Sequence, residues 1–244
     1  MDYPLYMASL SAATPPTRAD GRLASQIRPP VVEEGLLHRA DGSARLTVGH
    51  TVVLAATFGP GASRGARPGD RPELLSIEVV FGGSGGGSAS AGVPAEKMAS
   101  YRARLLEVLR CAVRLEAYPR CGLVVALRVL RDDGGVFAAL VNVACAALMD
   151  AGVEMHCLPV GCAFAWARHS DGGEACAHGD MIVDPDSAEE AKHSIVTVVC
   201  GAGLKGSTLA VIASGPIGDS ALAQCASAAE AAALTYAEIS RRRV

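Results

Sequence analysis

The sequence predicts an α+β protein in which helices cover two β-sheets within a single domain. Each half of the 244-residue chain contains several strand-like runs followed by a helical run, a succession typical of layered α+β folds. The run 136–149 is almost wholly apolar, and a helix without a polar face must lie inside the protein. No linker-like segment separates the two halves, so we expect one domain over residues 18–244.

The first half is expected to open with short antiparallel strands. Two near-copies of one tetrapeptide, Arg18–Gly21 and Arg39–Gly42, end in Asp-Gly. This pair favours turns, because glycine accepts positive φ and aspartate can bond the backbone ahead of it. Strands are predicted at Val31–Leu37, at the alternating apolar positions of 44–48, and at Thr51–Phe58, where Gly59-Pro60 is expected to end the last of them.

A strand, a loop and a long helix are predicted next. Leu74–Phe81 is strand-like, and the glycine- and serine-rich stretch Gly82–Gly92 predicts a loop. A helix is expected from Ala95 to Tyr118-Pro119, because apolar residues recur at spacings of three and four. These residues are Met98, Tyr101, Leu105, Val108, Ala112 and Leu115.

A buried strand, Gly122–Leu130, and a turn, Arg131–Gly135, lead into the apolar helix. The second half predicts four further strands and a final helix, Asp219–Arg241, with one apolar stripe. The four strands are His156–Ala167, Asp180–Val183, Ser194–Cys200 and Thr208–Ser214. Gly201–Gly206 matches the dinucleotide pattern G-x-G-x-x-G, but a strand follows it where a helix is required. A hairpin turn is therefore the stronger prediction.

Composition narrows the function classes. The net charge of −3 argues against a free-standing nucleic-acid binder, so any RNA contact must be local or shared with partners. The eight cysteines show no regular spacing, which favours a reducing compartment over a disulfide framework. Residues 1–17 lack the features of a signal peptide, and we expect them to form a flexible tail. No apolar window is long enough to cross a membrane, so a soluble protein is expected.

Two clusters of potential metal ligands have a structural alternative. The acidic run Asp180–Glu190 could hold a divalent metal beside a phosphate. The stronger prediction is a strand end, a turn and a helix start, in which Asp186 is the N-cap and Glu189 its capping-box partner. A second set could suggest zinc, but its irregular spacing favours core thiols, and no metal site is predicted. The set consists of Cys157, Cys162, Cys176 and His178.

The sequence of residues 18–60 is similar to that of a known family. It contains R-A-D-G-R, then R-A-D-G-S-A, then G-H-T-V-V-L-A-A and G-P. These motifs resemble the opening of the RNase PH domain family, and the resemblance continues at lower density to the C-terminal helix. It implies the RNase PH fold (ribosomal protein S5 domain 2-like), with two four- to five-stranded sheets and central helices. The family contains phosphate-dependent RNA exonucleases and also inactive ring subunits of the RNA exosome.

Two motifs that serve catalysis in active members are altered here. Active members bind phosphate through D-G-G-T-R-[ST] at the start of the central helix, where an anion is favoured. This chain keeps Asp-Gly-Gly, but Val136, Phe137 and Ala138 follow it. Active members also carry D-x-D-x-x-x-D. The best match places Ile182 and Ala188 on the outer two aspartates and Asp184 on the middle one, while a shift of two residues does not restore the spacing. The resemblance therefore implies no catalytic residues.

The segment 128–155 looks especially like the non-catalytic exosome ring subunits. Within it, Asn142 in an apolar helix needs a buried hydrogen-bond partner, and Asp150-Ala-Gly152 is expected to end that helix. The resemblance implies a hetero-hexameric ring with other RNase PH-like subunits, cap subunits and an associated exonuclease. It further implies 3′-to-5′ processing of single-stranded RNA (rRNA maturation, mRNA turnover) in the nucleus, nucleolus and cytoplasm, with no cofactor.

The resemblance also indicates arginines that could contact RNA. They are Arg102 and Arg104 in the first long helix, and Arg64 and Arg67 in the preceding loop. The alternative for all four is a solvated surface charge. Two other functions stay open: an active exoribonuclease, phosphorolytic or hydrolytic, that uses the acidic run, and a homo-hexameric binding module.

Overall fold

The computed structural model describes residues 18–62, 76–81, 94–166, 181–202 and 208–241. They form two sheets, with strand orders β1-β2-β3-β5-β4 and β7-β6-β8-β9. The first sheet consists of β1 (Pro30–Glu34), β2 (Gly42–Val48), β3 (Thr51–Ala62), β4 (Ser76–Phe81) and β5 (Cys121–Arg131). The second consists of β6 (Leu158–Trp166), β7 (Met181–Val183), β8 (Ser194–Ala202) and β9 (Thr208–Ser214). The α+β prediction is confirmed.

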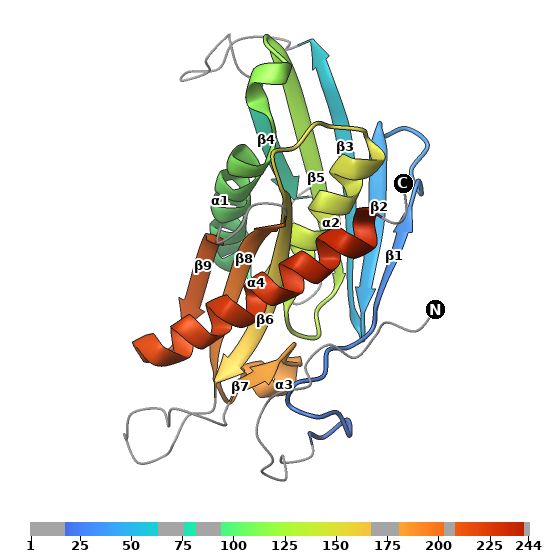
Figure 1. Ribbon diagram of the computed structural model, residues 1–244. Coiled ribbons are helices and arrows are strands. Elements are labelled where there is room, and N and C mark those ends of the chain that lie inside the picture. Colours follow the sequence, from blue (N-terminus) through green and yellow to red (C-terminus); the bar gives the residue numbers. More distant parts are fainter. Residues whose placement is uncertain (1–17, 63–75, 82–93, 167–180, 203–207, 242–244) are drawn as a thin grey trace.

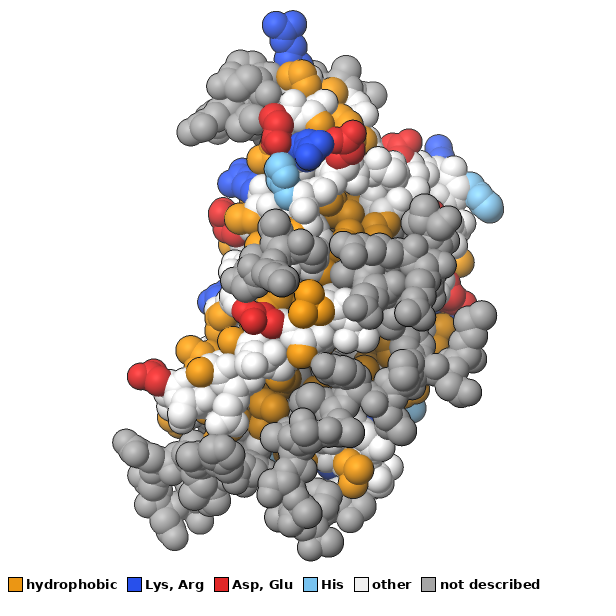
Figure 2. All heavy atoms as spheres, in the orientation of Figure 1, with side chains coloured by type: hydrophobic (Ala, Val, Ile, Leu, Met, Phe, Trp, Pro, Cys, Tyr) orange, Lys and Arg blue, Asp and Glu red, His pale blue; other side chains and the backbone are white. Residues whose placement is uncertain are grey.

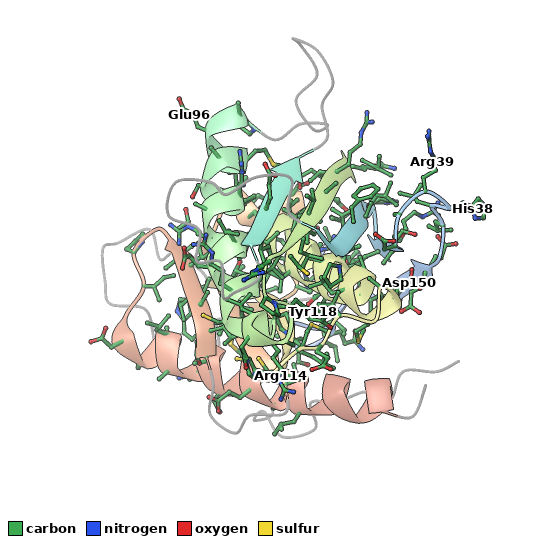
Figure 3. All side chains as sticks on the ribbon, turned by 90° about the horizontal axis from the view of Figure 1, so that it is seen from above. His38, Arg39, Glu96, Arg114, Tyr118 and Asp150 are labelled. Carbon is green, nitrogen blue, oxygen red and sulfur yellow. The ribbon has the colours of Figure 1, made fainter. Side chains whose placement is uncertain are left out.

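The helices are α1 (Ala95–Ala112), α2 (Val136–Asp150), the single turn α3 (Ser187–Glu190) and α4 (Asp219–Arg241). The apolar helix α2 lies between the sheets, because it packs on β2 and β3 on one side and on β6 on the other. α4 covers the second sheet across β6 and β8 (Figure 1). Viewed from above, α4 forms an outer layer along the lower edge of the picture (Figure 3). No helix among the described residues is long and apolar enough to span a membrane.

All strand pairs are antiparallel except β4 with β5, which is parallel. β8 and β9 form an antiparallel pair, so the strand after Gly201–Gly206 returns beside the strand before it, as the hairpin prediction requires. Residues 203–207 themselves lie outside the described residues. The predicted tail, residues 1–17, and the predicted loop at 82–92 also lie outside them.

Three predicted boundaries were wrong by more than two residues. β1 ends at Glu34, because Gly35 has a φ of +69° and leaves the strand. β3 continues past Gly59-Pro60 to Ala62, because a shift in register at this point accommodates the proline within the pair with β5. α1 ends at Ala112, because the next residue, Val113, turns extended and pairs with Met155.

The predicted buried partner of Asn142 is the backbone of β6. The Asn142 side-chain amide donates to the Gly161 carbonyl at 3.0 Å, and its oxygen accepts from the Gly161 N–H at 2.8 Å. Residue 161 must be glycine, because a Cβ there would lie 2.9 Å from the Cα of Ala138. The two hydrogen bonds therefore fix the position of α2 beneath the second sheet.

The C-terminal end of α2 also follows the prediction. Gly152 has a φ of +66°, as expected of a glycine that ends a helix. The Asp150 carboxylate accepts a 2.8 Å hydrogen bond from the Ser43 N–H in β2. Figure 3 shows Asp150 at the edge of the molecule, beside the turn that carries His38 and Arg39. This bond ties the second R-A-D-G turn to the central helix.

Candidate active site at the start of the central helix

The turn into α2 needs two glycines. Gly134 and Gly135 have φ values of +84° and +67°, a region that glycine enters without strain. A Cβ on Gly134 would lie 2.5 Å from the Pro185 carbonyl oxygen. A hydrogen bond from β3 also stabilises the turn, because the Thr51 hydroxyl donates to the Gly134 carbonyl at 2.8 Å. The two glycines of the Asp-Gly-Gly sequence are thus explained by local geometry.

The three residues that follow this turn point into the core. Val136, Phe137 and Ala138 have exposed fractions of 5%, 2% and 7%. The Phe137 ring packs against the Tyr101 ring of α1, with 5.1 Å between centroids. None of the three side chains carries a hydrogen-bond donor, so any anion at this helix start would meet only backbone N–H groups from them.

The start of α2 already has a carboxylate beside it. The Gly135 N–H donates to Oε1 of Glu190 at 2.7 Å. Burial raises the pKa of Glu190, and Asp132 adds to the effect, while the Gly135 N–H, Lys97 and Arg28 oppose it. The ammonium of Lys97 lies 5.7 Å from the centre of the Tyr101 ring. Burial lowers the pKa of Lys97, but Tyr101, Glu190 and Asp132 outweigh it and raise that pKa overall.

Asp184 is bound by the arginines of the N-terminal arm, defined here as residues 18–28. Arg28 forms a forked pair with it, from Nη2 to Oδ1 at 2.7 Å and from Nε to Oδ2 at 2.9 Å. The Arg28 N–H also donates to Oδ2 at 2.7 Å, and Nη1 of Arg22 lies 3.3 Å from the same oxygen. A carboxylate with this many donors is a structural anchor, because its lone pairs are occupied.

Arg28 connects three segments of the chain. Its Nη1 donates to the Asp133 carbonyl at 2.7 Å, in addition to the pair with Asp184. Arg28 is buried, with an exposed fraction of 7%. Burial lowers its pKa, but the hydrogen bond to Asp184 and the charges of Asp184, Asp133 and Asp186 raise it overall. The arm, the turn before α2 and the loop after β7 therefore share one buried cation.

The predicted capping box is confirmed. The Asp186 carboxylate accepts from the Glu189 N–H at 2.8 Å, and the Glu189 carboxylate accepts from the Asp186 N–H at 2.9 Å. Both carboxylate oxygens of Glu189 also bind Arg18, one of them from Nε at 2.7 Å. The acidic run is thus joined to the arm at two places, Asp184 and Glu189, and this joint explains why the arm carries Arg18, Arg22 and Arg28.

The two residues that replace the outer aspartates of D-x-D-x-x-x-D lie on either side of Asp184. Ile182 is in β7 and pairs with Ala165, and Ala188 is exposed on α3. Within the described residues, no group of three or more histidine, cysteine, aspartate or glutamate side chains could hold a metal ion. Asp180, Cys176 and His178 lie outside the described residues.

The described cysteines of the second hypothetical cluster are core thiols. Cys157 is buried and Cys162 is partly buried. Burial raises the pKa of Cys162 to about 12, with smaller contributions from Cys200 and Asp184. A thiol with such a pKa stays protonated at neutral pH and is a poor nucleophile.

The predicted RNA-contacting arginines are only partly described. Arg102 and Arg104 are exposed on α1, and the Arg104 Nε lies 3.3 Å from the Ser100 hydroxyl. Arg64 and Arg67 lie outside the described residues. On the face in Figure 2, the described lysine and arginine side chains are scattered and do not form one continuous patch.

Sequence reasoning missed Lys97, and it missed the contact between Glu190 and the start of α2. Lys97 and Tyr101 are one helical turn apart on α1, and the Tyr101 ring contacts Phe137 at the start of α2, but nothing in the sequence pairs them with residue 190. Glu190 was assigned to the first turn of a helix, where acids are common. Its contact with Gly135 depends on how the loop after β7 folds against the turn before α2, a long-range arrangement.

The contribution of the Arg18–Glu189 pair to the free energy of unfolding depends on pH. Burial raises the pKa of Glu189, but the hydrogen bonds from Arg18 and the Asp186 N–H outweigh it, so the pKa lies below 4.5. The pair therefore stabilises the folded state above pH 4.5 and loses this effect as pH falls through the lowered value. We expect Glu189→Gln to be less stable than the wild type at pH 7 and to approach it in stability in strong acid. Urea unfolding across this range checks it, and a constant difference at every pH would contradict it.

Comparison with known proteins identifies a family and relatives with similar sequences. Residues 26–154 match the family described as the 3′ exoribonuclease family (RNase PH), domain 1. The chain is 35% identical over 174 residues to the rice (Oryza sativa) exosome complex exonuclease RRP46 homolog, an alignment that covers 71% of this chain and 66% of that protein. It is 38% identical over 178 residues to the human exosome complex component MTR3, covering 67% of this chain and 62% of that protein. The chain thus spans slightly less than two thirds of these relatives.

Solved structures have the same fold. The crystal structure of rice Rrp46 superposes with a TM-score of 0.79 at 31% identity, covering 92% of this chain and 98% of that one. An Archaeoglobus fulgidus exosome with RNA bound to the active site superposes with a TM-score of 0.70 at 20% identity, covering 91% of each chain, a likeness in fold alone.

Two sheets around a central helix that begins at a Gly-Gly turn define the RNase PH fold. The chain belongs to the RNase PH family of 3′ exoribonucleases.

Proposed function

We propose that this protein is a non-catalytic structural subunit of the hexameric ring of the RNA exosome, and that it supports 3′-to-5′ RNA processing and degradation. The observation that carries the proposal is the composition of the start of α2. Val136, Phe137 and Ala138 are packed in the core and offer no phosphate ligand. Phosphorolysis requires cationic or hydroxyl donors next to the scissile bond, and the first three side chains of α2 supply none of them.

The carboxylates of Asp184 and Glu189 also support a non-catalytic role. Asp184 and Glu189 are engaged with Arg28 and Arg18, so neither is a free base or metal ligand. The acidic run instead forms the joint between the arm and the second sheet. Such a structural role of the acidic run is consistent with a subunit that has the RNase PH fold but no catalytic activity.

Exposed apolar side chains on the outer face of the first sheet support assembly with other subunits. Val31, Phe58 and Leu130 have exposed fractions of 55%, 42% and 43%. They belong to β1, β3 and β5, and they alternate along these strands with residues that pack on α2. Exposed apolar area of this kind is typical of surfaces that contact other proteins. The proposed neighbours are other RNase PH-like subunits in a hetero-hexameric ring.

The remaining partners follow from this role. Cap subunits and an associated exonuclease would complete the complex, and single-stranded RNA would pass to that exonuclease. With a net charge of −3, the chain would add only local contacts to RNA, for which Arg102 and Arg104 are the described candidates. The role implies residence in the nucleus, the nucleolus and the cytoplasm, with rRNA maturation and mRNA turnover as the processes served.

Assembly state tests the ring proposal. The isolated chain, measured by native mass spectrometry, is expected to be a monomer or to pair with one specific partner. Capture of the tagged protein from cells, followed by mass identification, should recover further RNase PH-like subunits. A closed homo-hexamer of the isolated chain, with no such subunits recovered, would contradict the proposal and favour the homo-hexameric binding module.

A further inference from the structure

A short antiparallel bridge joins the end of α1 to the segment before β6. Val113 pairs with Met155, and the His156 N–H donates to the Ala112 carbonyl at 2.7 Å. In an antiparallel register, the residue before one member of a pair faces the residue after the other. The two segments therefore lie side by side where α1 ends, and each carries a cysteine one residue beyond the hydrogen-bonded pair.

The two cysteines are Cys111, in the last turn of α1, and Cys157, which directly precedes β6. Consecutive Cα atoms are about 3.8 Å apart, so each cysteine lies close to the 2.7 Å hydrogen bond between His156 and Ala112. Burial raises the pKa of Cys157, and the Cys111 thiol raises it further. The two thiols therefore lie within electrostatic reach of each other, as the backbone register indicates.

The two thiols differ in their access to solvent. Cys111 is exposed, whereas Cys157 is buried, with an exposed fraction of 4%. A third thiol, Cys145 of α2, is fully buried. Burial, with a smaller contribution from Cys157, raises the pKa of Cys145 to about 12, so this thiol stays protonated and reacts poorly. An oxidant in solution therefore meets Cys111 first, and Cys157 is the thiol placed to react next.

We propose that Cys111 and Cys157 form an oxidation site, at which a hydroperoxide converts the two thiols into a reversible disulfide. In the first step the Cys111 thiolate attacks the peroxide and the O–O bond breaks. One oxygen forms a sulfenic acid on Cys111, and the other leaves as water or, from an organic hydroperoxide, as an alcohol. In the second step the Cys157 sulfur attacks the sulfenic sulfur, an S–S bond forms, and the hydroxyl leaves as water with the proton of the Cys157 thiol. Two electrons thus pass from the two thiols to the peroxide.

This disulfide would link the two halves of the chain covalently, because α1 belongs to the first half and β6 to the second. The loop that it closes contains β5 and α2. Neither cysteine lies at the start of α2 or in the acidic run, so the oxidation site goes beyond the proposed function and does not depend on it. Disulfides in a reducing compartment are usually transient and redox-sensing, and a reversible link between these cysteines fits that class.

Peptide mapping of the folded, reduced full chain after treatment with hydrogen peroxide tests this proposal. The remaining thiols are blocked with an alkylating reagent, and the protein is digested without reductant and analysed by mass spectrometry. The variants are Cys111→Ser, at the exposed position, and Cys157→Ala, at the buried one. The matched control is Cys121→Ser, which removes a partly exposed thiol from the start of β5. A parallel wild-type sample is oxidised in urea, so that the pairing in the unfolded chain is also measured.

We expect peptides joined through Cys111 and Cys157 in the wild type and in Cys121→Ser, released by dithiothreitol and more abundant than in the urea sample. In Cys111→Ser, Cys157 should stay reduced, and in Cys157→Ala, Cys111 should accumulate as the sulfenic acid or its higher oxides. A disulfide of Cys111 with any other cysteine, within or between chains, would overturn the proposal. So would an equal yield in urea, or a wild type in which Cys111 is oxidised while Cys157 stays reduced. Because Cys111 is exposed, Cys111→Ser is expected to fold and to give its result whether or not Cys157→Ala folds.

Discussion

Replacing Arg28 with methionine is expected to lower the free energy of unfolding by about 3–5 kcal/mol, as measured by urea denaturation at pH 7. The substitution keeps most of the apolar stem but removes the cation. Asp184 is then left partly buried without the forked pair from Nη2 and Nε, and the Asp133 carbonyl loses its donor at 2.7 Å. An uncompensated buried charge costs much more than an exposed ion pair contributes.

A matched control is the exposed pair on the first sheet. Arg45 Nε lies 2.8 Å from Glu33, and both side chains are nearly half exposed. Arg45→Met is therefore expected to cost only about 0–1 kcal/mol. Equal losses of unfolding free energy at Arg28 and Arg45 would show that the N-terminal arm is not a structural joint. The explanation that the acidic run anchors this arm would then be wrong.

Replacing Asn142 with leucine is expected to cost about 2–6 kcal/mol of unfolding free energy. The substitution is close in volume, but it leaves the N–H and the carbonyl of Gly161 without the bonds at 2.8 and 3.0 Å. Each unpaired buried backbone group costs about 1–3 kcal/mol. The melting temperature and urea midpoint measure the effect.

Met149→Leu serves as the control for Asn142→Leu, because it lies on the same helix and removes no hydrogen bond. It should cost less than about 1.5 kcal/mol. If Asn142→Leu were as mild as this control, the two bonds to Gly161 would not fix α2 beneath the second sheet.

Local sequence patterns predicted much of the fold. The apolar run of α2, the period of α1 and the Asp186–Glu189 capping box depend on neighbouring residues, and the structure agrees with them. Asn142 was also found from sequence, because a polar residue in an apolar helix needs a partner. The identity of that partner, Gly161, depends on strand packing and could not be predicted.

Apart from the end of β1 at Gly35, the missed features depend on distant contacts. α1 stops at Ala112 because Val113 pairs with Met155, although the apolar spacing continues to Leu115. Arg28 looked like an ordinary arm residue, and its pairing with Asp184 spans 156 positions. The motif comparison identified which side chains are altered at the start of α2, but not that Glu190 lies beside that start.

The most direct test of the non-catalytic role is an RNA degradation assay on the purified chain. End-labelled poly(A) is incubated with the protein, inorganic phosphate and Mg²⁺, and the products are resolved by length and by nucleotide type. No phosphate-dependent shortening and no nucleoside diphosphates are expected, because the start of α2 has no side-chain phosphate ligand. Release of nucleoside diphosphates that depends on phosphate and disappears in Asp184→Asn would contradict the ring-subunit proposal and favour an active exoribonuclease.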